Sequence, residues 1–199
     1  DGQPKSGIVW VNEMRLNSFN EDGGWAANAH MIAKMADFGV VSLAGSTMKP
    51  GFGSLESKLN SRNQSDVYTY DVAGDFELGK FFSEKAGVRI PMHVGYSESI
   101  ANAKYSPTDQ DLLLKTALKY LPNQHAKDSV LMLAQDFTAR KSINFTNVGV
   151  APPTAKPSII SPSNFSLTYA YYETYSRNPQ MERQLQKNYK GIFSYAYNQ

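Results

Sequence analysis

The residues between Tyr68 and Phe82 alternate between apolar and polar positions over an unusually long run. The even positions are mostly apolar, as at Val72 and Phe76, and the odd positions are mostly polar or small, as at Asp71 and Asp75. Such alternation predicts a β-strand with one apolar face and one hydrated face. An ordinary strand ends after about 5–6 residues. At roughly 3.3 Å per residue and a tilt near 45°, this run is long enough to cross a bilayer core of about 30 Å.

Seven further segments show the same alternation with differing regularity. They are residues 8–16, 25–35, 40–48, 89–100, 142–150, 165–175 and 185–197. Turn-forming residues separate some of them, for example Asp37, Phe38 and Gly39. The sequence therefore predicts an all-β fold of about eight antiparallel transmembrane β-barrel strands.

The connections between these segments differ in length. Those after residues 35 and 82 are short, whereas those after residues 48 and 100 are long, which is typical of the short periplasmic turns and longer extracellular loops of outer-membrane barrels. Within residues 101–141 we expect a helical loop insertion. Thr108 to Asp111 resembles a capping box with Asp in place of Glu, and leucines follow at helical spacing as far as Leu121. After the break at Pro122, residues 127–141 predict a second short helix.

The phase of the alternation assigns side chains to the two faces. The residues expected to face lipid are Tyr68, Tyr70, Val72, Phe76, Leu78, Phe82, Met92, Val94, Tyr96, Leu167, Tyr169, Phe193 and Tyr195. The residues expected to face a water-filled lumen are Asp71, Asp75, Glu77, His93, Ser97, Ser166, Thr168 and Lys190. Aromatic residues gather near the ends of the apolar run, as they do in the two interfacial girdles of an outer-membrane barrel.

Composition narrows the class of protein. The net charge of +2 gives no strong field for a nucleic-acid partner. The mean hydropathy of −0.44 and the lack of any apolar run of about 18 residues exclude a transmembrane helix. The chain has no cysteine, which excludes a disulfide framework and a thiolate metal site.

We find no motif that carries catalytic chemistry. His30, His93 and His125 lack the spacing of metal ligands, and no serine lies in a nucleophile-elbow sequence. The carboxylates of the strand that includes Asp71 and Asp75 could do acid–base chemistry, but on a lumen face they more simply hydrate the interior. We therefore expect no enzyme activity, no catalytic residue, no cofactor and no metal.

Several stretches resemble one known family, the translocon of the type 9 secretion system, called SprA in gliding bacteria and Sov in others. The resembling stretches are WVNEMRL at 10–16, GGWAA at 23–27, ADFG at 36–39, SLAGS at 42–46, PGFGS at 50–54, YDV at 70–72, ELGKFF at 77–82, IPMHVGY at 90–96, RKSINFTN at 140–147, NFSLTY at 164–169 and NYKG at 188–191. They cover nearly the whole chain. One departure is YSPTDQD at 105–111, which has fewer prolines than the family pattern.

The resemblance implies a function for the alternating strands. Proteins of this family are single-chain outer-membrane barrels of very large strand number that export folded cargo and support gliding motility. The implied partners are the remainder of the same barrel, a PorV-type outer-membrane shuttle protein, a periplasmic plug protein, secreted cargo with a C-terminal sorting domain, and membrane lipid. Residues 1–199 would then be an internal segment of the barrel wall.

Two other classes of protein fit the alternation itself. One is a self-contained eight-stranded outer-membrane barrel of the anchor or adhesin type. The other is a soluble, lipocalin-like barrel whose apolar faces turn inward to form a core. The length of the strands and the aromatic residues near their ends favour a membrane protein.

Overall fold

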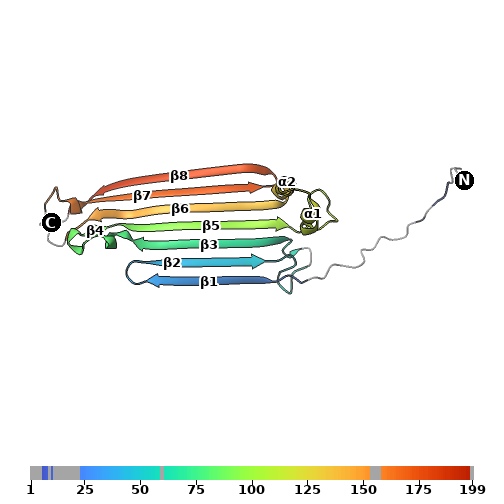
Figure 1. Ribbon diagram of the computed structural model, residues 1–199, viewed down its shortest axis with the longest axis horizontal. Coiled ribbons are helices and arrows are strands. Elements are labelled where there is room, and N and C mark those ends of the chain that lie inside the picture. Colours follow the sequence, from blue (N-terminus) through green and yellow to red (C-terminus); the bar gives the residue numbers. More distant parts are fainter. Residues whose placement is uncertain (1–5, 9, 11–22, 59–60, 153–157, 198–199) are drawn as a thin grey trace.

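The strands of the chain form a single antiparallel sheet (Figure 1). The computed structural model describes residues 6–8, 10, 23–58, 61–152 and 158–197. The sheet order is β1-β2-β3-β5-β6-β7-β8, and the short strand β4 pairs with β6 outside this path. The bounds are β1 Ala26–Met35, β2 Gly39–Met48, β3 Ser65–Glu77, β4 Val88–Arg89, β5 Pro91–Ala103, β6 Gln135–Val150, β7 Phe165–Asn178 and β8 Met181–Tyr195. The predicted antiparallel β-sheet is confirmed.

The sheet is one layer thick, and no second layer formed by the described residues covers either face along the strands (Figure 1). Among the described residues, the buried hydrophobic ones are Leu114, Ala134 and Ala139. A soluble domain of this length normally stabilises itself by enclosing a large apolar core between two layers. The described residues therefore do not enclose a core of that kind.

Two helices lie at one end of the sheet, α1 (Leu114–Tyr120) and α2 (Gln124–Ala134). We call this the helix end. The loop from β2 to β3 and the turn from β7 to β8 lie at the same end, and the opposite end, which we call the β4 end, carries the β1–β2 turn and β4 (Figure 1). Of the described residues, no helix has the length and apolar character needed to cross a membrane.

The predicted pair of helices between β5 and β6 is confirmed, but its details differ. The capping box does not form: α1 begins after Leu113, without a side-chain cap, and the Asp109 carboxylate instead accepts the N–H of Asp111. The second helix ends at Ala134, because the chain then joins the sheet as β6 and pairs with β5 and β7. Asn123 caps α2 by accepting the N–H of Ala126.

The long predicted strand ends earlier than its alternation suggests. Glu77 is the last residue of β3, and Leu78–Phe81 forms a 3-10 helix, η2. The Glu77 carboxylate accepts the N–H of Gly79 at 3.1 Å and the N–H of Ile90 at 2.8 Å. Glu77 therefore holds the turn after β3 together, and Leu78 and Phe82 do not extend the strand as predicted.

Two other predicted strands, residues 8–16 and 89–100, are not found as single continuous strands among the described residues. The segment 8–16 falls mostly outside the described residues. The segment 89–100 is divided by Ile90: β4 pairs with β6 at Val150 and Gly149, whereas β5 pairs with both β3 and β6.

Candidate functional surfaces

Cross-strand pairing gathers the alternating residues of neighbouring strands on the same two faces. Val72, for example, lies opposite Leu43 on one side and Tyr96 on the other. On one side, which we call the apolar face, are eleven of the residues expected to face lipid: Tyr68, Tyr70, Val72, Phe76, Met92, Val94, Tyr96, Leu167, Tyr169, Phe193 and Tyr195. On the other side, the polar face, are seven residues expected to face the lumen: Asp71, Asp75, His93, Ser97, Ser166, Thr168 and Lys190.

The apolar face exposes large side chains, whereas the polar face exposes few. On the apolar face, the exposed large hydrophobic residues of the strands are Met31, Met35, Tyr70, Val72, Tyr96, Ile143, Val150, Leu167, Tyr169, Leu185, Tyr189, Phe193 and Tyr195. On the polar face the corresponding residues are Ile32, Tyr172 and Ile192. Soluble monomers rarely expose an apolar patch of this extent, so this face is suited to lipid or to another protein.

At the helix end, the apolar face ends in a row of polar side chains that contact one another. This polar row consists of Lys49, Asp66, Asn102, Gln135 and Arg177. The Asn102 side chain accepts the Gln135 amide at 2.8 Å, and the Gln135 carbonyl accepts Arg177 at 2.5 Å. Farther along the row, the Lys49 ammonium lies 2.6 Å from the Asp66 carboxylate. This row marks where the apolar face gives way to polar surroundings.

Aromatic rings lie beside this polar row. The Lys49 ammonium is 4.5 Å from the centre of the Tyr68 ring and 5.8 Å from that of Trp25, and Arg177 is 5.4 Å from the centre of Phe137. The carboxylate of Asp66, with the hydroxyl of Tyr68, raises the pKa of Lys49 above its ordinary value. Rings next to cations and amides are typical of a membrane–water interface, where one edge of the ring is apolar and the other is wet.

A second aromatic group lies at the β4 end. The ring centres of Phe165 and Phe193 are 5.6 Å apart, and those of Phe165 and Tyr195 are 5.1 Å apart. In the β1–β2 turn, the ring of Phe38 lies 5.7 Å from that of Phe76. The apolar face is therefore bounded by aromatic residues at both ends. On β7 about ten residues separate the two groups, which at roughly 3.3 Å per residue and 45° tilt gives a band of about 23 Å.

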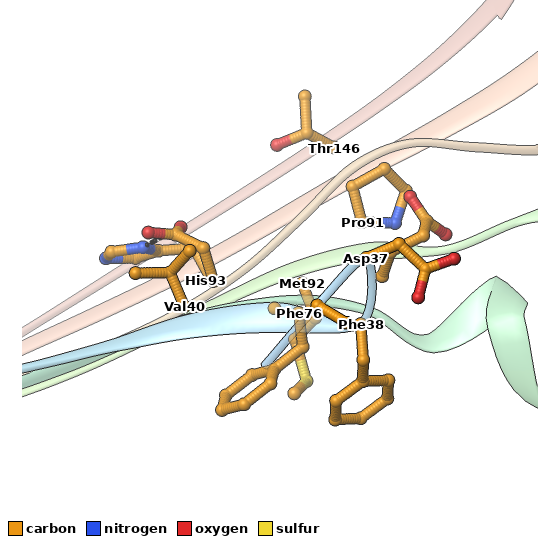
Figure 2. Close-up of a pocket in the computed structure, with 12 residues that line it drawn as sticks. Asp37, Phe38, Val40, Phe76, Pro91, Met92, His93 and Thr146 are labelled. Atoms are coloured by element: carbon orange, nitrogen blue, oxygen red, sulfur yellow. Dashed lines mark hydrogen bonds and ion pairs between the residues drawn. The ribbon is translucent and has the colours of Figure 1, made fainter. Parts of the chain in front are cut away.

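The polar face carries one close acid–histidine pair. His93 Nδ1 lies 2.6 Å from Asp75 Oδ1 across β3 and β5. Figure 2 shows His93 and Val40 pointing to one side of the sheet, and Phe76 and Met92 pointing to the other. These residues line a shallow cavity of about 420 Å³ at the β4 end. Both members of the pair are solvent-exposed.

A salt bridge lies at the edge of the same cavity. Lys80 Nζ is 2.7 Å from Asp37 Oδ2, and this contact lowers the pKa of Asp37. It links η2 to the β1–β2 turn. Among the described residues, no group of three or more His, Cys, Asp or Glu side chains is arranged to hold a metal ion.

Four charged residues interrupt the apolar face on β5 to β8. Glu173 lies 3.5 Å from Lys187 and 3.9 Å from Lys141, and it accepts the hydroxyl of Tyr171. On β5, Glu98 likewise accepts the hydroxyl of Tyr96. The sequence alone predicts no role for these four charged residues. The alternation of residues 165–175 nevertheless places Glu173 on the same face as the tyrosines of the apolar face.

A family model described as motility related/secretion protein, SprA_N, matches residues 1–118. No curated protein matches the chain.

Proposed function

Because the chain belongs to the SprA_N family of motility related/secretion proteins, we propose that its sheet is a section of the wall of the type 9 secretion translocon in the bacterial outer membrane. The observation that carries this proposal is a one-layer sheet with an apolar band on one face and a polar surface on the other. In a membrane barrel, the apolar face meets lipid and the polar face meets the aqueous lumen.

The two edges of the sheet favour a wall that continues. Among the described residues, β1 and β8 are the edge strands of the sheet, and nearly every residue in them is exposed. Unpaired backbone N–H and C=O groups are costly in lipid, so membrane sheets close into barrels without edges. If the described strands closed into a small barrel by themselves, β1 would pair with β8. We propose instead that further strands of the same large barrel pair with both edges.

The polar face suits a passive conduit. It presents mainly Ser, Thr, Asn and small residues with separated charges such as Asp71, Arg140 and Lys190. Such a surface hydrates a wide lumen and gives folded cargo no large apolar patch to adhere to. The proposed role of the residues is therefore structural. They form the wall and its rim, and perform no catalysis.

The soluble, lipocalin-like alternative fits the structure less well. A soluble barrel would turn its apolar face inward and pack it to the density of a protein core. Here Val72, Tyr70 and Phe193 are 45%, 50% and 69% exposed.

The remaining partners follow from the family resemblance. We propose a PorV-type shuttle protein, a periplasmic plug protein and cargo with a C-terminal sorting domain as partners of the complete translocon. The longer connections of the helix end are proposed to be extracellular, as in other outer-membrane barrels.

Cysteine scanning of β3 tests the membrane assignment. Single cysteines at residues 69–73 of the full-length protein, in a cysteine-free background, are treated in intact outer membranes with a membrane-impermeant thiol reagent. We expect labelling at Thr69, Asp71 and Ala73, and none at Tyr70 and Val72, because lipid excludes the charged reagent. Equal labelling at all five positions would rule out the proposal.

A further inference from the structure

A cavity of about 360 Å³ lies at the helix end, between α1 and the ends of β3 and β5. Three of its strand residues, Asp66, Tyr68 and Asn102, belong to the register of the apolar face. Its opposite wall includes Leu114 and Leu118 of α1. The cavity is therefore at the boundary that the polar row and its aromatic residues define.

Three ammonium groups line this cavity against one carboxylate. Lys49, Lys104 and Lys115 contribute three positive charges and Asp66 one negative charge, which leaves a net charge of +2. Lys49 and Lys115 share Asp66, at 2.6 and 3.2 Å. Lys104 lies over the ring of Tyr105, 5.3 Å from its centre, and no carboxylate of the described chain pairs with it. The single negative charge of the buried Asp66 therefore does not neutralise the three lysines, and the remaining net charge of +2 favours the binding of an anion.

The rest of the cavity wall is apolar. Leu113, Leu114, Leu118 and Leu131 line it, and Leu113 is 46% exposed. Leucines beside uncompensated lysines fit a ligand that has an anionic group and a hydrocarbon chain. A free inorganic anion would leave the leucines in water, and an acyl chain alone would leave the net positive charge of the cavity unmatched.

From this arrangement we propose that the cavity binds the phosphate headgroup of an anionic membrane lipid, with the lysines contacting the phosphate and the leucines contacting the first part of an acyl chain. The proposal rests on the membrane assignment above. That assignment places the cavity at the depth of the lipid headgroups, where a phosphate attached to hydrocarbon is the abundant anion. Lysines near an anionic membrane surface each contribute favourably to lipid binding.

Native mass spectrometry of the full-length, delipidated protein in detergent tests the proposal. The probes are dioleoylphosphatidylglycerol and dioleoylphosphatidylcholine, which share their acyl chains, and inorganic phosphate as a competitor. The test variant is Lys104→Gln/Lys115→Gln, which keeps the Lys49–Asp66 pair. The control variant is Lys119→Gln/Lys127→Gln, which removes the same charge from helical positions that do not line the cavity.

We expect the test variant to bind phosphatidylglycerol roughly tenfold or more weakly, and the control variant to bind it as the unchanged protein does. Equal loss in both variants, or no loss in either, would overturn the proposal. Equal affinity for the two lipids would also overturn it, as would full displacement by inorganic phosphate, which would indicate a free-anion site. The outcome is separable from the thiol-labelling result: alternate labelling together with failed lipid binding would refute this inference alone.

Discussion

Lys49 Nζ lies 2.6 Å from Asp66 Oδ1, and Asp66 also holds Lys115 of α1 at 3.2 Å. One largely buried carboxylate, at the start of β3, therefore joins this strand to the β2–β3 loop and to the first helix. We predict that Asp66→Asn lowers the local stability of the helical connection on the order of 2 kcal/mol, because two ammonium groups lose their shared partner. Hydrogen exchange of residues 114–134 in the full-length protein measures this. Asp109→Asn, at an exposed position, is the matched control and should leave the exchange unchanged.

The stability that the Lys49–Asp66 ion pair contributes is expected to fall at high pH. The pKa of Lys49 is raised in the folded protein, so its contribution to stability is complete below the ordinary value of 10.5 and is lost as the pH rises through the folded-state pKa. We predict that protection of the helical connection falls above pH 10.5 in the unchanged protein. In Asp66→Asn this step should be absent, and a step of equal size in that variant would contradict the assignment.

The two faces of β3 predict opposite responses to the same charge. Val72 lies on the apolar face about midway between the aromatic groups, and Asp71 is its neighbour on the polar face. We predict that Val72→Arg destabilises the folded barrel by about 2–4 kcal/mol, because a cation at the lipid-facing midplane loses its hydration. Asp71→Arg should have an effect within about 1 kcal/mol. Denaturant titration in bilayers of defined thickness measures both, and similar losses for the two variants would contradict the assignment of the faces.

The sequence predicted some elements of this structure more accurately than others. Strands β1 and β2 begin and end within one residue of their predicted bounds, because turn residues such as Asp37 bound their alternation. Strands β7 and β8 run three and four residues farther toward their shared turn than predicted, because they stay paired as far as Asn178 and Met181. The end of β3 was missed, because the Glu77 carboxylate satisfies two backbone N–H groups of the following turn, a contact that periodicity does not encode. Residues 135–141 look equally compatible with a helix until β5 and β7 are present to pair with them.

The surfaces were predictable only in part. The period of two assigns a residue to a face wherever a strand forms, which is why the lipid and lumen sets separate cleanly within the strands. The lysine-lined cavity was not predictable, because it joins the ends of β2, β3 and β5 to α1, and its residues are spread from Lys49 to Leu131. No local pattern indicates which loops meet at one end of a sheet.

The charged group around Glu173 allows a test of what the apolar face contacts. Glu173→Gln leaves Lys141 and Lys187 without their shared carboxylate, and we predict a measurable loss of stability. Replacing all three residues by leucine should restore stability if this part of the face meets lipid, because an apolar row fits hydrocarbon as well as the tyrosines do. Denaturant titration compares the two variants. A triple variant less stable than Glu173→Gln would show that the charges are needed for something other than mutual compensation.

Gly87 directly precedes β4 and has a left-handed backbone conformation that favours glycine. Its φ is 60°, and an added Cβ would lie 2.2 Å from the carbonyl oxygen of Ala151, whose N–H donates to Gly87 at 2.8 Å. We predict that Gly87→Ala costs about 2 kcal/mol or more and releases β4 from β6. Gly191→Ala is the matched control, because nothing lies within 4 Å of a Cβ there. Hydrogen exchange of Val88 and Val150 measures the release, and equal protection in both variants would contradict the prediction.

The open edges of the sheet predict which strands are neighbours in the assembled barrel. Asn28 of β1 lies directly opposite Ser46 of β2, so cysteines at these two positions should be joined by a short bis-maleimide. We predict that a cysteine at Asn28 is not joined to one at Gln184, Asn188 or Ile192 of β8, because six strand spacings of about 4.8 Å separate β1 from β8 across the sheet. The three β8 positions cover the different registers in which a closed small barrel could pair these strands. Gel mobility of the full-length protein after cross-linking and proteolysis reads out each pair, and an efficient β1–β8 cross-link would show that these strands close on themselves and do not continue into a larger wall.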